Sequence, residues 1–320
     1  MDEKGFRTYL QERKLSEEEI AASLALAQRF EAFTREAFTP HDYLAFSEHL
    51  IASGENTIAN YYALARYAYF TGDQAGYIRV VDLLDGAEAM GNFYQKAEFT
   101  LGAARRDAVF EGVELPQLGL PSPEKVRINE KVMIRLVEIA SPQECEQILC
   151  DSLRDLDEAW YADDKKLYED CDTLDEFLDK NAQNFVAMLE KLRDEGKPFF
   201  TQFITDEVIA YVRSEPLIAR GVSEGNILYE VKIPHQTADF LATDDPIEKR
   251  YHACHCPWVK ESLKNGASHI PATFCNCSGG FHKKRWESIF GQPLKAEIIE
   301  SVLQGDDRCL IAIHLPEGVA

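Results

Sequence analysis

Two short Cys-x-Cys motifs lie within the last seventy residues of this 320-residue chain, Cys254/Cys256 and Cys275/Cys277. A cysteine thiolate is both a nucleophile and a soft metal ligand, and four thiolates can enclose a zinc ion in a tetrahedron. The two pairs therefore predict a metal site, with zinc as the metal. The histidines that could replace one or two of the thiols are His252, His255 and His282.

Two other interpretations of these cysteines stay open. A thiol of lowered pKa could act as a nucleophile, and the candidates for catalysis are Cys256 and Cys277, with His255 as a neighbouring base. A zinc ion with one open ligand position could instead activate a water molecule. The thiols could also be plain core residues, since free cysteine is among the most buried residue types. Cys309 lies on the apolar side of the last predicted strand, and we expect it in the core.

Helix starts are predicted directly after both motifs. Pro257 suits the first helical position after Cys256, and Ser278 suits the N-cap position after Cys277. The helix dipole and the free N–H groups at such a terminus favour the thiolate over the thiol. We therefore expect lowered thiol pKa values at both motifs.

A second candidate site follows the second motif. Ser278, Gly279 and Gly280 would expose backbone N–H groups at a helix start, and such groups can bind an anion. Lys283 and Arg285 follow in the same predicted helix and add positive charge. The predicted ligand is a small anion, a carboxylate or a phosphate. The alternative is a solvated basic turn.

The formal net charge of −21 disfavours nucleic acid and anionic membrane as partners, because both carry negative charge themselves. Residues 251–320 are locally neutral, with seven basic and seven acidic side chains, so that an anionic ligand can approach them. The start of the chain lacks the apolar segment of a signal peptide, and no apolar run is long enough for a membrane helix. We expect a cytoplasmic protein whose cysteines are thiols or metal ligands. A homo-oligomer stays open.

The patterns of apolar residues predict two domains and an α+β fold. Residues 1–108 are helical in pattern, residues 109–125 are rich in Pro and Gly and predict a linker, and residues 126–320 form the second domain. In ILYEVKI, alternation over 227–233 predicts a strand with one buried face. The segments AEIIESVL and CLIAIHLP flank a Gly305 turn and predict a small antiparallel sheet that ends in a C-terminal hairpin.

The N-terminal part resembles the helical SAM-like core-binding domain of phage-type integrases. The resemblance runs from FEAFTREAFTPHDYLAFSEHL through SGENTIANYYALARYAYFTG. It implies a helical fold. A DNA-associated regulator is one function that it suggests, although a DNA-binding face needs positive charge and this segment is acidic.

The C-terminal part resembles the L-2-amino-thiazoline-4-carboxylic acid hydrolase-like family and, more distantly, 4-vinyl-reductase-like ligand-binding domains. The matching pieces are Cys256-Pro257 before a predicted helix to Gly266, the second Cys-x-Cys motif, and the ending SVLQGDDRCLIAI. The resemblance implies an α+β domain in which Cys256, Cys275 or Cys277, and Cys309 line or support a pocket.

Together these features predict a protein that binds zinc and a small molecule through its C-terminal domain. The first alternative is a hydrolase of a small cyclic amide or thiazoline that uses a cysteine or a metal-bound water. The second is the DNA-associated regulator.

Overall fold

The computed structural model describes residues 1–34, 38–151, 153–154, 156–266 and 268–319. Residues 35–37, inside the integrase-like stretch, lie outside this description. The chain forms two compact units, the first from residues 1–87 and 116–125 and the second from residues 88–115 and 126–320. The first unit is helical and the second contains both helices and antiparallel sheets, so that the predicted α+β class is confirmed.

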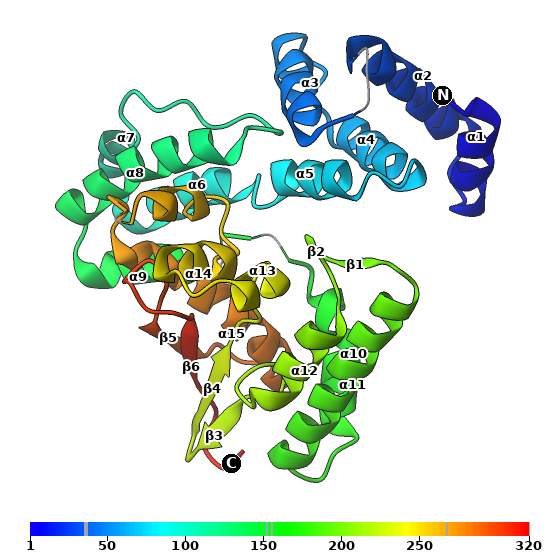
Figure 1. Ribbon diagram of the computed structural model, residues 1–320. Coiled ribbons are helices and arrows are strands. Elements are labelled where there is room, and N and C mark those ends of the chain that lie inside the picture. Colours follow the sequence, from blue (N-terminus) through cyan, green and yellow to red (C-terminus); the bar gives the residue numbers. More distant parts are fainter. Residues whose placement is uncertain (35–37, 152, 155, 267, 320) are drawn as a thin grey trace. The chain divides into compact units, whose positions relative to one another are not determined.

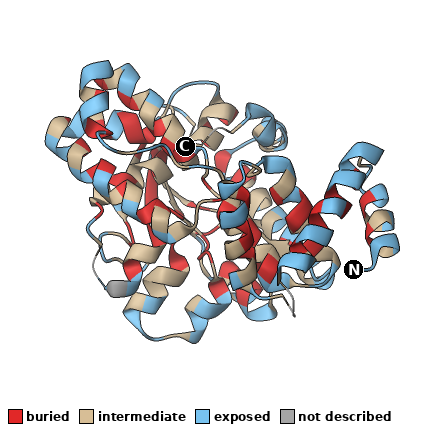
Figure 2. Cartoon of the chain, turned by 90° about the horizontal axis from the view of Figure 1, so that it is seen from above, coloured by how far each residue is buried: buried red, intermediate tan, exposed pale blue. Residues whose placement is uncertain are grey.

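The first unit is a group of short helices whose buried faces are rich in aromatic rings. Thr39 opens one helix with a capping box, because its side chain accepts from the N–H of Asp42 while the Asp42 carboxylate accepts from Thr39. Pro40 follows at the start of the helix, where its missing N–H costs no hydrogen bond. The helices are α1 Glu3–Glu12, α2 Glu17–Thr34, α3 Pro40–Ala52, α4 Ile58–Phe70 and α5 Gln74–Leu84. The largest buried side chains are Phe6, Phe30, Tyr43, Phe46, Tyr61 and Tyr67. Figure 2 shows such buried positions as stripes along the helices.

The segment 116–125 returns to the first unit and completes it. The Ser47 hydroxyl donates to the carbonyl oxygen of Gly119 over 2.8 Å. The buried Lys125 ammonium donates to the carbonyl oxygens of Leu83 (3.2 Å) and Asp85 (2.9 Å), at the end of α5. These bonds assign the second half of the predicted linker to the first unit. Residues 88–108, predicted in the helical N-terminal domain, belong to the second unit.

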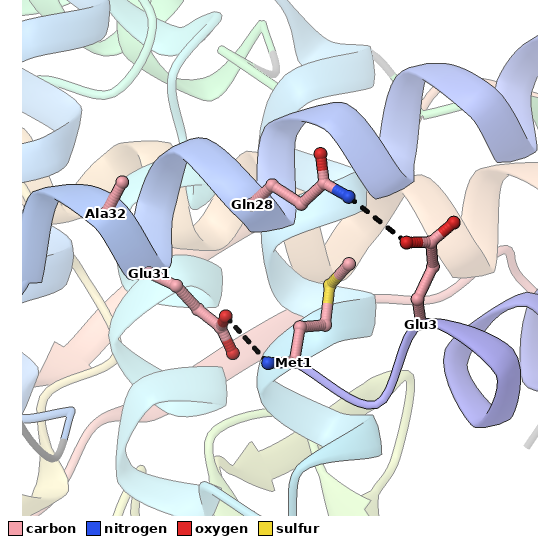
Figure 3. A pocket seen from close by; sticks show the side chains of 5 residues that line it. All are labelled: Met1, Glu3, Gln28, Glu31 and Ala32. Atoms are coloured by element: carbon pink, nitrogen blue, oxygen red, sulfur yellow. Dashed lines mark hydrogen bonds and ion pairs between the residues drawn. The ribbon is translucent and has the colours of Figure 1, made fainter.

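An open hollow of about 490 Å³ lies between α1 and α2 and is lined by Met1, Glu3, Gln28, Glu31 and Ala32. Its polar groups are paired with one another (Figure 3). The amino group of Met1 lies 2.9 Å from Glu31, and the Gln28 amide donates to Glu3 over 3.3 Å. Glu31 also accepts a hydrogen bond from Tyr67. This hollow therefore offers a ligand few polar groups that are not already bonded.

In the second unit, helices pack around a small sheet (Figure 1). Its helices are α6 Ala89–Leu101, α7 Ala103–Val109, α8 Ser122–Ile139, α9 Pro142–Cys150, η1 Glu158–Tyr161, α10 Ala162–Glu169, α11 Leu174–Asp194, α12 Asp206–Ser214, α13 Thr237–Ala242, α14 Pro246–Ala253, η2 Lys260–Asn265, η3 Ala272–Cys275 and α15 Asn276–Phe290. Helix α8 begins in the first unit. Strands β1 Pro198–Phe199 and β2 Gln202–Phe203 form a separate short hairpin.

The main sheet is antiparallel and has the strand order β3-β4-β6-β5. Its strands are β3 Val222–Glu224, β4 Ile227–Val231, β5 Lys295–Glu300 and β6 Leu310–His314. Strands β5 and β6 are the predicted C-terminal hairpin. Asp306, in the connecting loop, accepts from the backbone N–H of Ser301 over 2.8 Å. This confirms the turn role predicted for the Gly305–Asp307 region.

Both faces of the sheet are covered, so that the prediction of one buried face for the 227–233 strand is wrong. Leu228 lies in one core with Trp286 of α15 and Ile311 of β6. Val231 lies in another with Val208 of α12. A strand between two layers of helices buries residues on both of its sides. Glu230 points to the α15 side, as does Lys232, which follows the strand in the same alternation.

Within the described ranges, no helix combines the length and the apolar character that crossing a bilayer requires.

Two glycines of the first unit give a matched test of the return segment. Gly119 has a φ of +88°, and a Cβ there would lie 1.7 Å from the Tyr61 hydroxyl. Gly54 has a φ of +71° with nothing within 4 Å. We expect Gly54→Ala to lower the free energy of unfolding by about 1 kcal/mol, through backbone strain alone. Gly119→Ala adds steric overlap and should cost about 3 kcal/mol. Urea unfolding followed by far-ultraviolet circular dichroism measures both, and equal losses would contradict this role of Gly119.

Candidate functional site

The two Cys-x-Cys motifs have different positions relative to helices. Cys254 and Cys256 follow the end of α14, and Pro257 begins a turn. The helix predicted from there to Gly266 is the short 3-10 helix η2, which begins at Lys260 and has Gly266 as its C-cap. Helix α15 does begin at the second motif. Its N-cap is Cys275, however, whose side chain makes no capping bond, and Ser278 lies inside the first turn. The predicted N-cap role of Ser278 is therefore wrong.

Three of the four predicted thiols, together with Cys309, share one electrostatic environment. Burial is the main cause that raises the pKa of Cys254, and Cys256, Cys309 and Cys275 raise it further. The Ser301 hydroxyl donates to the Cys275 sulfur over 3.1 Å, and the neighbouring N–H of Val302 bonds to the Cys309 sulfur. Cys309 thus takes the fourth place in this group, which the sequence had assigned to Cys277.

Cys277 lies in a different environment from Cys275. The backbone N–H of Leu153 bonds to its sulfur, and Arg154 and Lys232 are its strongest charged neighbours. Cys277 also raises the pKa of Cys150, which burial brings to about 11. The two cysteines of this motif therefore do not face the same group of residues.

The thiols of Cys254, Cys275, Cys277 and Cys309 are held in the protonated form, and the predicted lowering of the pKa is wrong for the motif thiols among them. Burial is the largest cause at Cys254, Cys275, Cys277 and Cys309, and each pKa is raised. Removing a thiolate from water raises its free energy by more than the helix N-terminus and the N–H donors lower it. At neutral pH these side chains are therefore uncharged and weakly nucleophilic.

The residues present do not fit a zinc ion in the observed arrangement. Nowhere in the part of the chain that the structure describes are three or more His, Cys, Asp or Glu side chains grouped so as to hold a metal ion. The alternate ligands also have other partners, since His252 Nδ1 lies 3.2 Å from the Gln236 side-chain oxygen and His255 Nε2 lies 2.5 Å from the Ile233 carbonyl. Zinc stays a prediction from the sequence.

Metal analysis tests that prediction. A zinc site on Cys254, Cys256, Cys275 and Cys277 requires about one zinc per chain in protein purified without chelators, and loss of the metal on Cys254→Ser. Cys145→Ser is the matched control, because Cys145 is a buried thiol that donates weakly to the Leu136 carbonyl oxygen. Wild-type protein that is metal-free and folded would contradict the prediction.

The residues predicted to form an anion pocket on α15 point to different elements. A Cβ on Gly279 would contact Ile298 of β5, whereas one on Gly280 would lie 2.3 Å from the Cys150 carbonyl oxygen. These glycines allow close packing of α15. Arg285 pairs with Asp164 over 2.7 Å, and Lys283 lies 3.1 Å from Glu287. The structure does not gather Ser278, Gly279, Gly280, Lys283 and Arg285 around one point.

A pair of cations beside one aromatic ring forms a better candidate for an anion site. The Lys232 ammonium lies 5.5 Å from the centroid of the Phe281 ring, and the Arg154 guanidinium lies 5.7 Å from the same centroid. The backbone N–H of Lys232 donates to the Cys309 carbonyl oxygen over 3.4 Å, but its ammonium makes no hydrogen bond or ion pair with any residue that the structure describes. We call Lys232, Arg154 and Phe281 the cation site.

A buried polar network adjoins the cation site. His235 lies between Thr201, whose hydroxyl is 2.5 Å from Nε2, and Lys260, whose ammonium is 2.9 Å from Nδ1. The Lys260 ammonium also donates to Gln236 over 2.8 Å. Burial, followed by the positive charge of Lys260, lowers the pKa of His235 to about 2, and Lys232 and Arg154 contribute. The ring is therefore neutral and buried.

Sequence reasoning missed Lys232, Arg154, His235 and Lys260. Lys232 follows Glu230 on the side of the strand that the alternation assigns to solvent, and only the covered sheet shows that this side is inside. Arg154 lies in an irregular segment after α9 and carries no motif. The one available signal was the charged residue that directly follows an apolar strand.

The buried network makes a testable contribution to stability. Lys260→Met leaves the His235 Nδ1 and the Gln236 oxygen without this donor, which should lower the free energy of unfolding by about 2 kcal/mol. Lys264→Met is the matched control, because the ammonium groups of Lys260 and Lys264 lie 4.6 Å and 4.7 Å from the centroid of the Tyr251 ring, but Lys264 is half exposed. Its loss should stay below about 1 kcal/mol. Tryptophan fluorescence during urea unfolding reports on this unit, which contains Trp160, Trp258 and Trp286. Similar losses in the two variants would contradict the network's contribution.

Comparison with known proteins gives one partial match. A model of a family of unknown function, DUF6144, matches residues 223–320. The matched part spans both Cys-x-Cys motifs, Lys232, His235 and Phe281, whereas Arg154 lies outside it. No curated protein and no solved structure matches the chain.

Proposed function

We propose that the second unit binds a small anionic molecule, a carboxylate, at the cation site. The observation that carries this proposal is the Lys232 ammonium, which is partly buried beside Phe281 and has no hydrogen-bond or ion-pair partner among the described residues. A charge that is partly removed from water without a counter-ion is costly. An anion bound there would offset that cost and would also meet the Arg154 guanidinium.

The neighbouring groups leave the site positive. The raised thiol pKa values and the lowered pKa of His235 make these side chains neutral at pH 7. The carboxylates nearby are Glu88, Asp306 and Glu230, of which Glu230 is paired with His282. On Cys277 the effects of Arg154 and Lys232 exceed that of Glu88. At Cys309 the effect of Lys232 exceeds that of Asp306. The local potential therefore favours an anion although the whole chain is acidic.

The free cysteines support a reducing compartment. All eight are free thiols, as cytoplasmic proteins usually require. We therefore place the protein in the cytoplasm as part of the proposal. A cysteine hydrolase is less favoured, because its nucleophile would need a lowered pKa and the candidate Cys277 has a raised one.

Calorimetric titration of the full chain with benzoate tests the proposal. We expect Lys232→Met to raise the Kd at least about tenfold, because it removes a charge-assisted contact. Lys249→Met is the matched control, since the Lys249 ammonium also lies near a phenylalanine ring, 5.9 Å from the centroid of Phe240. Its Kd should equal that of the wild type. An unchanged Kd in Lys232→Met, or no binding of benzoate, acetate or succinate to the wild type, would overturn the proposal.

A further inference from the structure

A histidine and a carboxylate form a pair next to the cation site. His282 of α15 places Nδ1 3.2 Å from the carboxylate of Glu230 on β4. The Trp286 indole N–H donates to the other oxygen of the same carboxylate over 3.3 Å. The side chains of His282 and Glu230 are 17% and 12% exposed, so that the pair is largely shielded from water.

The hydrogen bonds fix the protonation of the imidazole. A carboxylate accepts, so Nδ1 carries the proton and Nε2 keeps its lone pair. Nε2 makes no hydrogen bond with any residue in the described ranges, and it is not among the buried nitrogens that are sealed from solvent. Burial lowers the pKa of His282, Lys232 and Arg285 lower it further, and Glu230 opposes them. The ring is thus neutral at pH 7 and can take a proton at Nε2.

The pair and the cation site share one side of the sheet. Glu230 and Lys232 alternate on the same face of the β4 segment, and Phe281 precedes His282 on α15 with 5.9 Å between their ring centroids. The positive charge of Lys232 acts directly on His282. A molecule bound against Lys232 and Phe281 therefore lies beside this histidine.

We propose that His282 is a general base that removes a proton from the carbon next to the carbonyl of a 2-oxo acid bound at the cation site. This inference rests on the proposed anion binding. The thiols of Cys275, Cys277 and Cys309 are neutral, whereas His282 offers a lone pair, so that proton transfer is the chemistry that these side chains supply unaided. The carboxylate of the 2-oxo acid would pair with Arg154, and its carbonyl oxygen would face Lys232.

The step balances without a further reactant. The Nε2 lone pair takes the proton, the electrons of the broken C–H bond form a C=C bond, and the C=O electron pair moves onto oxygen. The enolate oxygen becomes negative next to the Lys232 ammonium, which lowers the barrier because the charge develops beside a fixed cation. The imidazolium, paired with Glu230, returns a proton to the carbon and restores the keto form. In heavy water that proton exchanges with solvent, so that turnover leaves deuterium on the carbon.

Proton NMR of pyruvate in heavy water with the full chain tests the inference. We expect methyl deuteration above the rate in buffer alone, and a loss of about 100-fold in His282→Gln. The matched control is His314→Gln, because His314 Nε2 lies 3.1 Å from Glu297 on the more exposed part of the same sheet. That variant should exchange at the wild-type rate.

The pH profile distinguishes a base from a merely structural histidine. The exchange rate should rise with pH as His282 loses its proton, with a midpoint below 6.5. Glu230→Gln removes the charge that favours the imidazolium, so that the midpoint should move to lower pH, whereas Lys232→Met should move it to higher pH. Circular dichroism spectra identify any variant that fails to fold, and NMR titration of the His282 ring in pyruvate-free protein gives the same midpoints independently of turnover.

The outcomes separate the two proposals. Pyruvate binding with exchange at the buffer rate, or with equal exchange in wild type and His282→Gln, overturns the base role and leaves anion binding intact. Failure of benzoate and pyruvate to bind overturns the anion site and, with it, the base role. A midpoint that does not move in Glu230→Gln also overturns the assignment to His282.

Discussion

In the second unit, β4 pairs with β6 from Ile227 opposite His314 to Val231 opposite Leu310. This register decides which side chains face α15. It places Leu228 and Ile313 in the core beneath Trp286, and it carries Glu230 and Lys232 along the same side toward the start of that helix. A slip of one residue would turn every one of these side chains to the opposite face. The pairing of two central strands thus positions the apolar core and the polar groups together.

Desolvation then determines which of these polar groups carry charge. Burial raises the pKa of the thiols and lowers that of His235 and His282, so that both residue types are neutral at pH 7. The ammonium of Lys232 and the guanidinium of Arg154 lie beside the Phe281 ring. The site therefore resembles neither a zinc site of four thiolates nor an anion pocket at the start of α15, which were the two sites that the sequence predicted. Its character comes from two cations among neutral thiols and imidazoles, beside a Glu230 carboxylate that His282 and Trp286 hold.

The elements that the sequence predicted well are those set by local interactions. The helices of the N-terminal part, such as α4, and the C-terminal hairpin each depend on residues close in the chain. The Cys-x-Cys motifs did locate the polar region. Local pattern could not give the partners of each thiol, because Cys275 and Cys277 lie two residues apart yet meet different elements. It also assigned the side of β4 that bears Lys232 to solvent, since alternation identifies two faces without showing that both are covered.

The return segment has a consequence for how the chain can be divided. The polypeptide leaves the first unit after Ala87, comes back at Pro116 and leaves again after Lys125. A gene fragment that stops at residue 87 would lack Gly119 and Lys125. It would leave the carbonyl groups at the end of α5 without their ammonium donor and would uncover the hydroxyls of Ser47 and Tyr61. The smallest piece that contains every residue of the first unit ends at Lys125. Residues 88–115, which belong to the second unit, would remain in that piece as an insertion.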